Sequence, residues 1–309
     1  MKRLLAHGDM LVWEKDDFTC LKNGYLGIDG DGIDYIGREA PRDAYDETKD
    51  MTGKLLLPGL VNGHTHTGMS LLRGLGSDLP LKEWLFDTVF PVEDRLTDED
   101  LRIGMELSML EMIASGTTAF TDMYMGASYC APAVLASGMK ANLCRPLQSF
   151  DPEEEPMTCR RMREMLALYD EWNGAGNGRI KTDFSIHAEY TCTEKMVRAA
   201  AEEAQKRGAG MHIHLSETEG EQRACVEKYG LTPAQWFDKL GAFNGRAYAA
   251  HCVWCTDDDF RIMAEKGVSL VHNPTSNMKL GSGFARVPKM LDMGINVAIG
   301  TDGAASNNN

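Results

Sequence analysis

The sequence contains no run of about eighteen apolar residues, the length that a membrane-spanning helix requires. We therefore expect no membrane partner. Positive charge is also scarce, because 32 Lys and Arg residues stand against 46 Asp and Glu residues, which gives a formal net charge of −14. Such a surface repels phosphate backbones, so we expect no nucleic acid partner either.

Cysteines spaced as in a disulfide framework are absent as well. The eight cysteines are scattered, and Met1–Asp9 breaks its apolar run too early to resemble a secretory signal peptide. These two features predict reduced thiols and a cytoplasmic protein. The composition, 43% hydrophobic and 25% charged, is that of a globular protein, and 309 residues permit one large α/β domain, alone or with a small partner domain.

Residues 1–56 are rich in short strand patterns and polar turns. Leu4–Trp13 is one expected strand, and Tyr25–Ile28 and Ile33–Gly37 form an expected hairpin around a turn at residues 30–32. We interpret residues 1–56 as the N-terminal part of a small β-sandwich domain.

From residue 57 onward, strand patterns alternate with helical patterns. The expected strands are Leu57–Asn62, Thr117–Met123, Ala141–Leu147, Lys181–His187, Gly210–Leu215, Ala247–Val253, Val268–His272 and Ile295–Ile299. Eight such strands with helices between them predict an α/β fold in which residues 57–309 form a TIM (β/α)8 barrel. The last barrel helix is missing after Gly300, so we expect the chain to be a fragment of a longer protein.

Two histidines, His64 and His66, follow the first apolar strand. Side chains two residues apart on a strand point to the same face, so both imidazoles aim at one place. Imidazole is the commonest side-chain metal ligand, and two on one face supply half of a metal site. A His-x-His pair also occurs by chance in loops, so the pair by itself leaves a metal site and an ordinary loop open.

The remaining strand ends decide between these two interpretations. Catalytic groups of a TIM barrel lie at the C-terminal ends of its strands. The groups found there are His187, His214 with Glu217, His251, His272 and Asp302. This concentration of histidine predicts a metal centre of three imidazoles and one carboxylate, which suits zinc or a similar divalent ion with a position left for water.

Several of these residues have other interpretations. His212 shares a strand face with His214 but lies deeper, which favours a hydrogen-bonded histidine of the core. His272 precedes an Asn-Pro pair, which favours an indirect or structural role. Glu217 fits an acid that moves protons to a substrate nitrogen, and it fits equally well an acidic residue in the first turn of a helix.

Two short motifs point to other enzyme classes. His187-Ala-Glu189 and Cys252-Val-Trp-Cys255 resemble parts of the cytidine-type zinc deaminase signature, but the proline before the first cysteine is missing. Ser276-Asn-Met-Lys279 matches the Ser-x-x-Lys motif of penicillin-recognising enzymes without its partner motifs. We interpret both as chance matches.

Five stretches together resemble the amidohydrolase superfamily, in its deaminase and chlorohydrolase branch. They are Pro58-Gly-Leu-Val-Asn-Gly-His-Thr-His66, His212-Ile-His-Leu-Ser-Glu217, Ala250-His-Cys252, His272-Asn-Pro-Thr-Ser-Asn277 and Gly300-Thr-Asp-Gly303. Three more resemble the 5′-methylthioadenosine/S-adenosylhomocysteine deaminases: Leu71-Leu-Arg-Gly-Leu75, Glu83-Trp-Leu85 and Pro91-Val-Glu-Asp-Arg95. The resemblance extends over essentially the whole chain, in the right order.

The resemblance implies a metal-dependent hydrolytic deaminase in which hydroxide attacks C6 of an adenine. His64, His66, His214 and Asp302 would bind one divalent metal ion, which is zinc by preference, with iron or manganese as alternatives. His251 would hold and help deprotonate the water, and Asp302 would double as a base. Glu217 would carry a proton to N1 of the ring and then to the leaving ammonia.

The resemblance also implies how a small-molecule nucleoside is held. Glu93 matches the position that grips the ribose hydroxyls, and His187 matches the one that contacts the purine. Arg145 matches the first of two arginines that hold a homocysteine carboxylate, whereas Met157 stands at the offset of the second. Arg160, close by, and Trp84 are further candidates for substrate contact.

The substrates implied are 5′-methylthioadenosine, S-adenosylhomocysteine, 5′-deoxyadenosine and adenosine. The departure at Met157 favours the nucleosides that carry no carboxylate. Two alternatives stay open. One is another hydrolase of the same branch, acting on guanine, cytosine or a triazine, and the other is a non-catalytic barrel that binds metal or ligand only. Barrels of this branch commonly form homo-oligomers, but the sequence identifies no interface.

Overall fold

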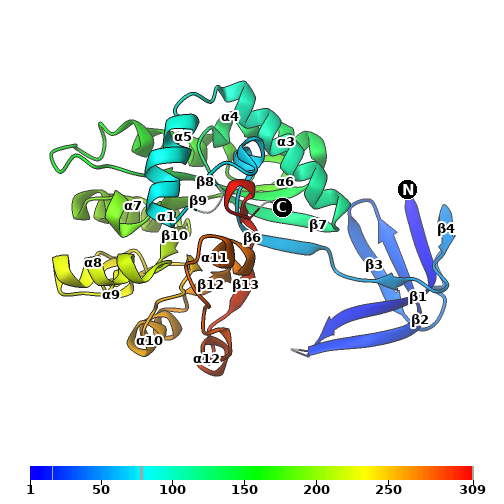
Figure 1. Cartoon of the computed structure of the whole chain (residues 1–309). Helices are drawn as coiled ribbons and strands as arrows, with labels where there is room; N and C mark the ends of the chain where they lie inside the picture. Colours follow the sequence, from blue (N-terminus) through cyan, green and yellow to red (C-terminus); the bar gives the residue numbers. More distant parts are fainter. Residues whose placement is uncertain (16, 77–78, 308–309) are drawn as a thin grey trace. The chain divides into compact units, whose positions relative to one another are not determined.

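The computed structural model describes residues 1–15, 17–76 and 79–307, which separate into two compact units, Met1–Leu60 and Val61–Asn309 (Figure 1). Each unit is built on its own sheet. Among the described residues, no helix combines the length and the apolar composition needed to cross a membrane.

The first unit is a small β structure. Its strands are β1 (Lys2–Glu14), β2 (Asp17–Asp29), β3 (Gly32–Gly37), β4 (Glu47–Asp50) and β5 (Leu55–Leu56). The order across the sheet is β3-β2-β1-β4, and β5 pairs with β1. The expected hairpin is present, because β2 and β3 are antiparallel and Gly30, with a φ of 62°, makes the turn between them.

The second unit is built around a parallel sheet. Its strands are β6 (Leu60–His66), β7 (Thr117–Met123), β8 (Lys140–Leu147), β9 (Ile180–Ile186), β10 (Met211–Leu215), β11 (Ala247–His251), β12 (Ser269–His272), β13 (Val297–Ile299) and β14 (Asp302–Gly303). Neighbours along the sheet follow the order β13-β12-β11-β10-β9-β8-β7-β6-β14. The sequence order of the strands is therefore also their order in space, as in a barrel wound in one direction.

The last two strands close the barrel. β13 pairs with β12, β14 pairs with β6, and only Gly300 and Thr301 separate them in the chain. Asn62 of β6 fixes this junction, because its Oδ1 accepts a hydrogen bond from the Thr301 amide at 3.0 Å and its Nδ2 donates to Thr301 Oγ1 at 2.7 Å. A Cβ at Gly300 would lie 2.9 Å from the amide nitrogen of His64, so only glycine permits this approach. The predicted TIM-barrel fold is confirmed.

Helices surround this sheet (Figure 1). The longer ones are α3 (Asp98–Ala114), α4 (Ala127–Ser137), α5 (Arg160–Trp172), α7 (Glu194–Arg207), α8 (Glu219–Tyr229), α9 (Pro233–Lys239) and α10 (Asp257–Lys266). The shorter helical segments are η1 (Thr67–Leu72), α1 (Leu81–Glu83), η2 (Trp84–Val89), α2 (Phe90–Glu93), α6 (Ala175–Gly178), η3 (Glu189–Thr191), α11 (Pro274–Lys279), α12 (Val287–Asp292) and α13 (Ala304–Asn307).

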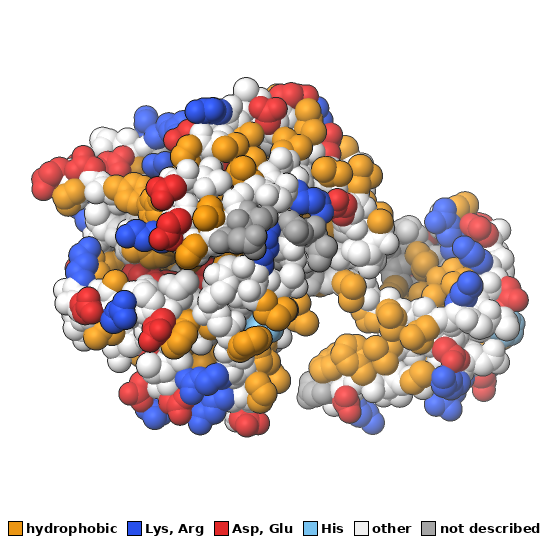
Figure 2. Space-filling view, in the orientation of Figure 1, with side chains coloured by type: hydrophobic (Ala, Val, Ile, Leu, Met, Phe, Trp, Pro, Cys, Tyr) orange, Lys and Arg blue, Asp and Glu red, His pale blue; other side chains and the backbone are white. Residues whose placement is uncertain are grey.

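Side-chain caps determine where several of these helices begin. Thr97 Oγ1 accepts a hydrogen bond from the Asp100 amide at 3.2 Å and so caps the N-terminus of α3. Charges on the outer helices pair between neighbours: Asp257 of α10 contacts Arg286 at 2.7 Å and Lys289 of α12 at 3.4 Å. Figure 2 shows acidic and basic side chains intermixed over the region of α10 and α12.

Several expected strand boundaries were wrong, and for two of them the local backbone gives the reason. β6 begins at Leu60, because Pro58 has no amide hydrogen to donate to a neighbouring strand. The strand then continues through both His64 and His66. β11 ends at His251 rather than at Val253, because His251 and Cys252 adopt left-handed φ angles of 72° and 50°, which turn the chain away from the strand direction. The sequence interpretation also missed α4, whose interior contains Pro132.

Candidate functional site

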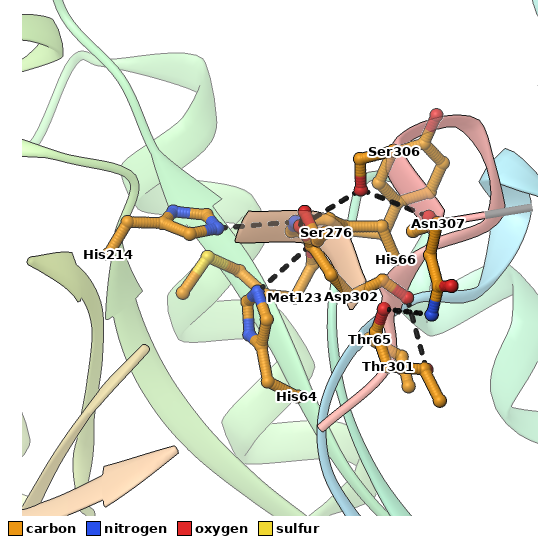
Figure 3. A network of polar contacts seen from close by, with 12 residues as sticks. His64, Thr65, His66, Met123, His214, Ser276, Thr301, Asp302, Ser306 and Asn307 are labelled. Carbon is orange, nitrogen blue, oxygen red and sulfur yellow. Dashed lines mark hydrogen bonds and ion pairs between the residues drawn. The ribbon is translucent and has the colours of Figure 1, made fainter. Parts of the chain in front are cut away.

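Four side chains from three parts of the barrel meet at the C-terminal ends of the strands. His64 and His66 come from β6, His214 from β10 and Asp302 from β14. One potential ligand atom of each lies within 4.8 Å of those of the others. Figure 3 shows the three imidazoles and the carboxylate turned toward one another. The structure thus brings together the four ligands expected from the sequence.

Hydrogen bonds on the outer side of the imidazoles fix which nitrogen faces the centre. His66 Nδ1 donates to the Met123 carbonyl at 2.6 Å, and His214 Nδ1 donates to the His187 carbonyl at 2.8 Å. In the neutral rings the proton is therefore on Nδ1, and the lone pair of Nε2 points inward. Behind His64, the Nε2 of His212 lies 2.9 Å from its Nδ1, so His212 supports a ligand from deeper in the barrel.

The inward atoms fit a bound cation. His64 Nε2 is buried and has no hydrogen-bond partner among the residues that the structure describes. Burial lowers the pKa of His64 to about 4, which keeps its lone pair free. The Nε2 atoms of His66 and His214 are only 3.2 Å apart. Two lone pairs at that distance repel each other, and either a bound cation or a proton on His66, whose pKa the Asp302 carboxylate raises to about 9 against the effect of burial, removes that repulsion. Three imidazole nitrogens and one carboxylate are a suitable donor set for a divalent metal such as zinc.

Asp302 is oriented by two serines that the sequence interpretation did not identify. Its Oδ2 accepts hydrogen bonds from Ser276 Oγ at 2.6 Å and from Ser306 Oγ at 2.9 Å. Its Oδ1 faces the histidines, 3.3 Å from His64 Nε2 and 3.1 Å from His66 Nε2. One oxygen of the carboxylate is thus held in place while the other is available to a metal ion.

His251 and Glu217 lie beside the four ligands. His251 Nδ1 donates to Asn277 Oδ1 at 2.8 Å, and its Nε2 lies 3.7 Å from Glu217 Oε2. Ser282 Oγ donates to Glu217 Oε1 at 3.2 Å. Burial raises the pKa of Glu217 to about 7, so this carboxyl gains and loses a proton near neutral pH.

The backbone around Glu217 is held by a second carboxylate, that of Glu221. Glu221 Oε1 accepts a hydrogen bond from the Ser216 amide at 2.8 Å, and Oε2 accepts one from the Glu217 amide at 2.8 Å. Ser216 itself has a φ of 47°, which a non-glycine residue adopts only when its surroundings enforce it. Glu221, on α8, therefore fixes the turn that aims Glu217 at the cavity.

The metal centre opens into a cavity of about 630 Å³. Glu93 and Tyr124 line it, and Tyr124 Oη donates to Glu93 Oε1 at 2.5 Å. Burial raises the pKa of Glu93, which is 8% exposed. His187 also lines the cavity, and burial lowers its pKa to about 3, so its imidazole is neutral.

The other expected contact residues divide into two groups. Arg145, Arg160 and Trp84 line the cavity, and Trp84 donates its indole N–H to the Leu75 carbonyl at 3.2 Å. Met157, at the offset of the expected second arginine, is 59% exposed and is not among the lining residues. Tyr124, Ser276, Ser282, Ser306 and Glu221 were missed, because hydroxyls and helix-capping acids are too common in a sequence to be singled out.

Neither chance match supplies one of the four candidate ligands, although Ser276 contacts Asp302 and His187 lines the cavity. Among the described residues, the only group with metal-ligand geometry contains neither Cys252 nor Cys255, both of which are buried thiols. Lys279, the lysine of the Ser-x-x-Lys match, donates to the Ala305 carbonyl at 2.8 Å.

Comparisons with known proteins agree with this geometry. A 5-methylthioadenosine/S-adenosylhomocysteine deaminase of Acetivibrio thermocellus is 44% identical, over 100% of this chain and 71% of that protein. A 5′-deoxyadenosine deaminase of Methanosarcina barkeri is 45% identical, over 94% of this chain and 66% of that protein. The chain thus spans about two thirds of the length of these relatives.

A solved structure shares both the fold and part of the sequence. An adenosine deaminase of Xanthomonas campestris with bound zinc superposes with a TM-score of 0.90 at 32% identity, over 99% of this chain and 70% of that one. Residues 55–309 match the sequence profile of the Amidohydrolase family. The chain therefore belongs to the amidohydrolase family, and within it to the group of 5′-methylthioadenosine/S-adenosylhomocysteine deaminases.

Proposed function

We propose that the protein hydrolyses the C6 amino group of adenine nucleosides, releasing ammonia and the corresponding inosine analogue, with one zinc ion held by His64, His66, His214 and Asp302. The observation that carries the proposal is the buried set of three imidazoles and a carboxylate beside Glu217 and His251. The relatives named as adenine nucleoside deaminases, at 44% and 45% identity, support the substrate class.

The chain's own residues account for the proton transfers. A divalent ion at this centre supplies a Lewis acid that makes water nucleophilic near neutral pH. His251 Nε2 faces Glu217 and accepts the proton of the attacking water, while Asn277 keeps the other ring nitrogen protonated. Glu217, with a pKa of about 7, delivers its proton to N1 of the purine, takes up the second proton of the attacking water and passes it to the departing ammonia. The proton held by His251 then returns to Glu217, whose carboxylate lies 3.7 Å away.

The cavity also supports a ribose-containing substrate. Tyr124 occupies one oxygen of the buried Glu93 carboxylate, and the other oxygen remains available to accept hydrogen bonds from ribose hydroxyls. The imidazole of His187 is neutral because its pKa is lowered, which suits contact with an uncharged purine ring.

The proposal is tested by ammonia release from zinc-supplemented protein. The substrates are 5′-methylthioadenosine, S-adenosylhomocysteine, adenosine and guanine, measured side by side. We expect turnover of adenine nucleosides and none of guanine, because a free base has no ribose hydroxyls for Glu93 to bind. Turnover of guanine alone, or no turnover by protein with one bound zinc ion per chain, would contradict the proposal.

Replacing Glu93 with alanine is expected to raise KM for adenine nucleosides about 10- to 100-fold, the loss expected for a hydrogen bond to a charged group. KM for adenine as a free base should change much less. Steady-state kinetics on both substrates measures this difference. Glu83→Ala is the matched control, because Glu83 is exposed and does not line the cavity. An equal rise in KM for nucleoside and base would show that Glu93 does not bind the ribose.

A further inference from the structure

One wall of the cavity carries an ion pair that the proposed reaction does not use. Arg145 of β8 and Glu164 of α5 both line the cavity, whereas the metal ligands come from β6, β10 and β14. Arg145 is 7% exposed, and Glu164 Oε2 lies 2.7 Å from its Nε. The charge of this buried guanidinium is thus balanced inside the protein, before any substrate arrives.

Each partner of this pair makes one further contact. Arg145 Nη1 donates to the Pro146 carbonyl at 2.8 Å. Glu164 Oε1, the oxygen that does not bind Arg145, lies 3.6 Å from Nε of Arg160. A ligand carboxylate that approached Arg145 would meet the negative charge of Glu164 at the same guanidinium. A ligand ammonium that approached Glu164 would have to displace one of two arginines.

We propose that Glu164 is a specificity-determining residue, which neutralises Arg145 and so selects adenine nucleosides with small uncharged 5′ substituents over nucleosides that carry a carboxylate. This inference rests on the proposed deaminase function and concerns the same cavity. An uncharged group such as methylthio, hydroxyl or hydrogen leaves the Arg145–Glu164 pair intact. A carboxylate must either break the pair or lie beside the like charge of Glu164, and both weaken its binding to a guanidinium that is itself buried.

The inference is tested with a pair of substrates that differ by a carboxymethyl group. They are 5′-methylthioadenosine and 5′-S-(2-carboxyethyl)-5′-thioadenosine, and the measured quantity is the ratio of kcat/KM for the carboxylate to that for the methylthio compound. In Glu164→Gln we expect this ratio to rise at least about tenfold, as Arg145 becomes available for a charge-assisted hydrogen bond. Glu171→Gln, an exposed position on the same helix, should leave the ratio as it is in the wild type.

A double variant shows whether the gain depends on Arg145. In Arg145→Gln/Glu164→Gln the ratio should fall back to about its wild-type value, because no guanidinium remains to be released. A ratio in Glu164→Gln within twofold of wild type would overturn the inference. A gain that persists without Arg145 would overturn it too. Loss of S-adenosylhomocysteine turnover in Glu164→Gln would also overturn it, since Glu164 would then bind the ammonium of that substrate.

The same experiment separates the two proposals. If 5′-methylthioadenosine is deaminated and the ratio does not move, only the role of Glu164 is wrong. If zinc-loaded wild-type protein deaminates no nucleoside, the proposed function fails, and the selectivity inferred for its cavity fails with it. Thermal unfolding of each variant confirms that a changed ratio is measured on folded protein.

Discussion

Glutamine in place of Glu217 is expected to lower kcat for adenine nucleosides about 10³-fold, within the range found for general acid–base groups. Glutamine has the same shape and still accepts the hydrogen bond from Ser282, but it cannot transfer a proton. The backbone of Glu217 is held by Glu221 and not by its own side chain, so the turn should survive the substitution. Steady-state kinetics on zinc-loaded protein measures the loss.

Bound zinc and KM separate this effect from damage to the site. Both should stay close to their wild-type values in Glu217→Gln, because Glu217 is not one of the four ligands. Glu219→Gln provides the matched control, since Glu219 lies two residues further along the chain and is exposed. More than a tenth of wild-type kcat in Glu217→Gln would assign the proton transfer to another group, with His251 and Asp302 as the nearest candidates.

Two simple rules gather histidines at the strand ends, and the resemblance to the amidohydrolase superfamily then implies which four side chains are the ligands. Parallel strands end at one edge of a sheet, and alternate residues of a strand share a face, which together place His64, His66 and His214 at one point. These two rules do not place the carboxylate of Asp302, because its position depends on a left-handed backbone at the first residue of β14. Counting strands in the sequence also could not predict how the barrel closes through Gly300 and Thr301, because this closure requires a close approach of two backbone segments.

The residues that orient these ligands could not be predicted, for a physical reason. Ser276 and Ser306 come from two short helices, and nothing in their local sequence indicates that both hydroxyls reach one carboxylate. Glu221 appears in the sequence as a capping residue of α8, a role that it also performs. Glu164 appears as a surface residue of an amphipathic helix. Such contacts depend on tertiary packing, which local patterns do not encode.

Replacing Asp302 with asparagine is expected to abolish stable zinc binding. The substitution removes the only negative charge among the four ligands, while the serines that hold the side chain remain. Removing a residue that is hydrogen-bonded to a metal ligand weakens metal binding about 10- to 100-fold. Removing a ligand itself should weaken metal binding by more than this. Zinc content after dialysis should fall from about one ion per chain to a small fraction, and deaminase activity should fall with it.

Thermal unfolding gives a second readout that does not depend on catalysis. Zinc at 100 times its Kd stabilises the folded state by about 2.7 kcal/mol, which corresponds to a rise in Tm of roughly 5–10 °C for a unit of this size. Asp302→Asn should lose this rise and Asp292→Asn, an exposed control, should keep it. If Asp302→Asn keeps both zinc and the rise in Tm, Asp302 is not a ligand. The close pair of His66 and His214 nitrogens would then have to hold the ion with His64 alone.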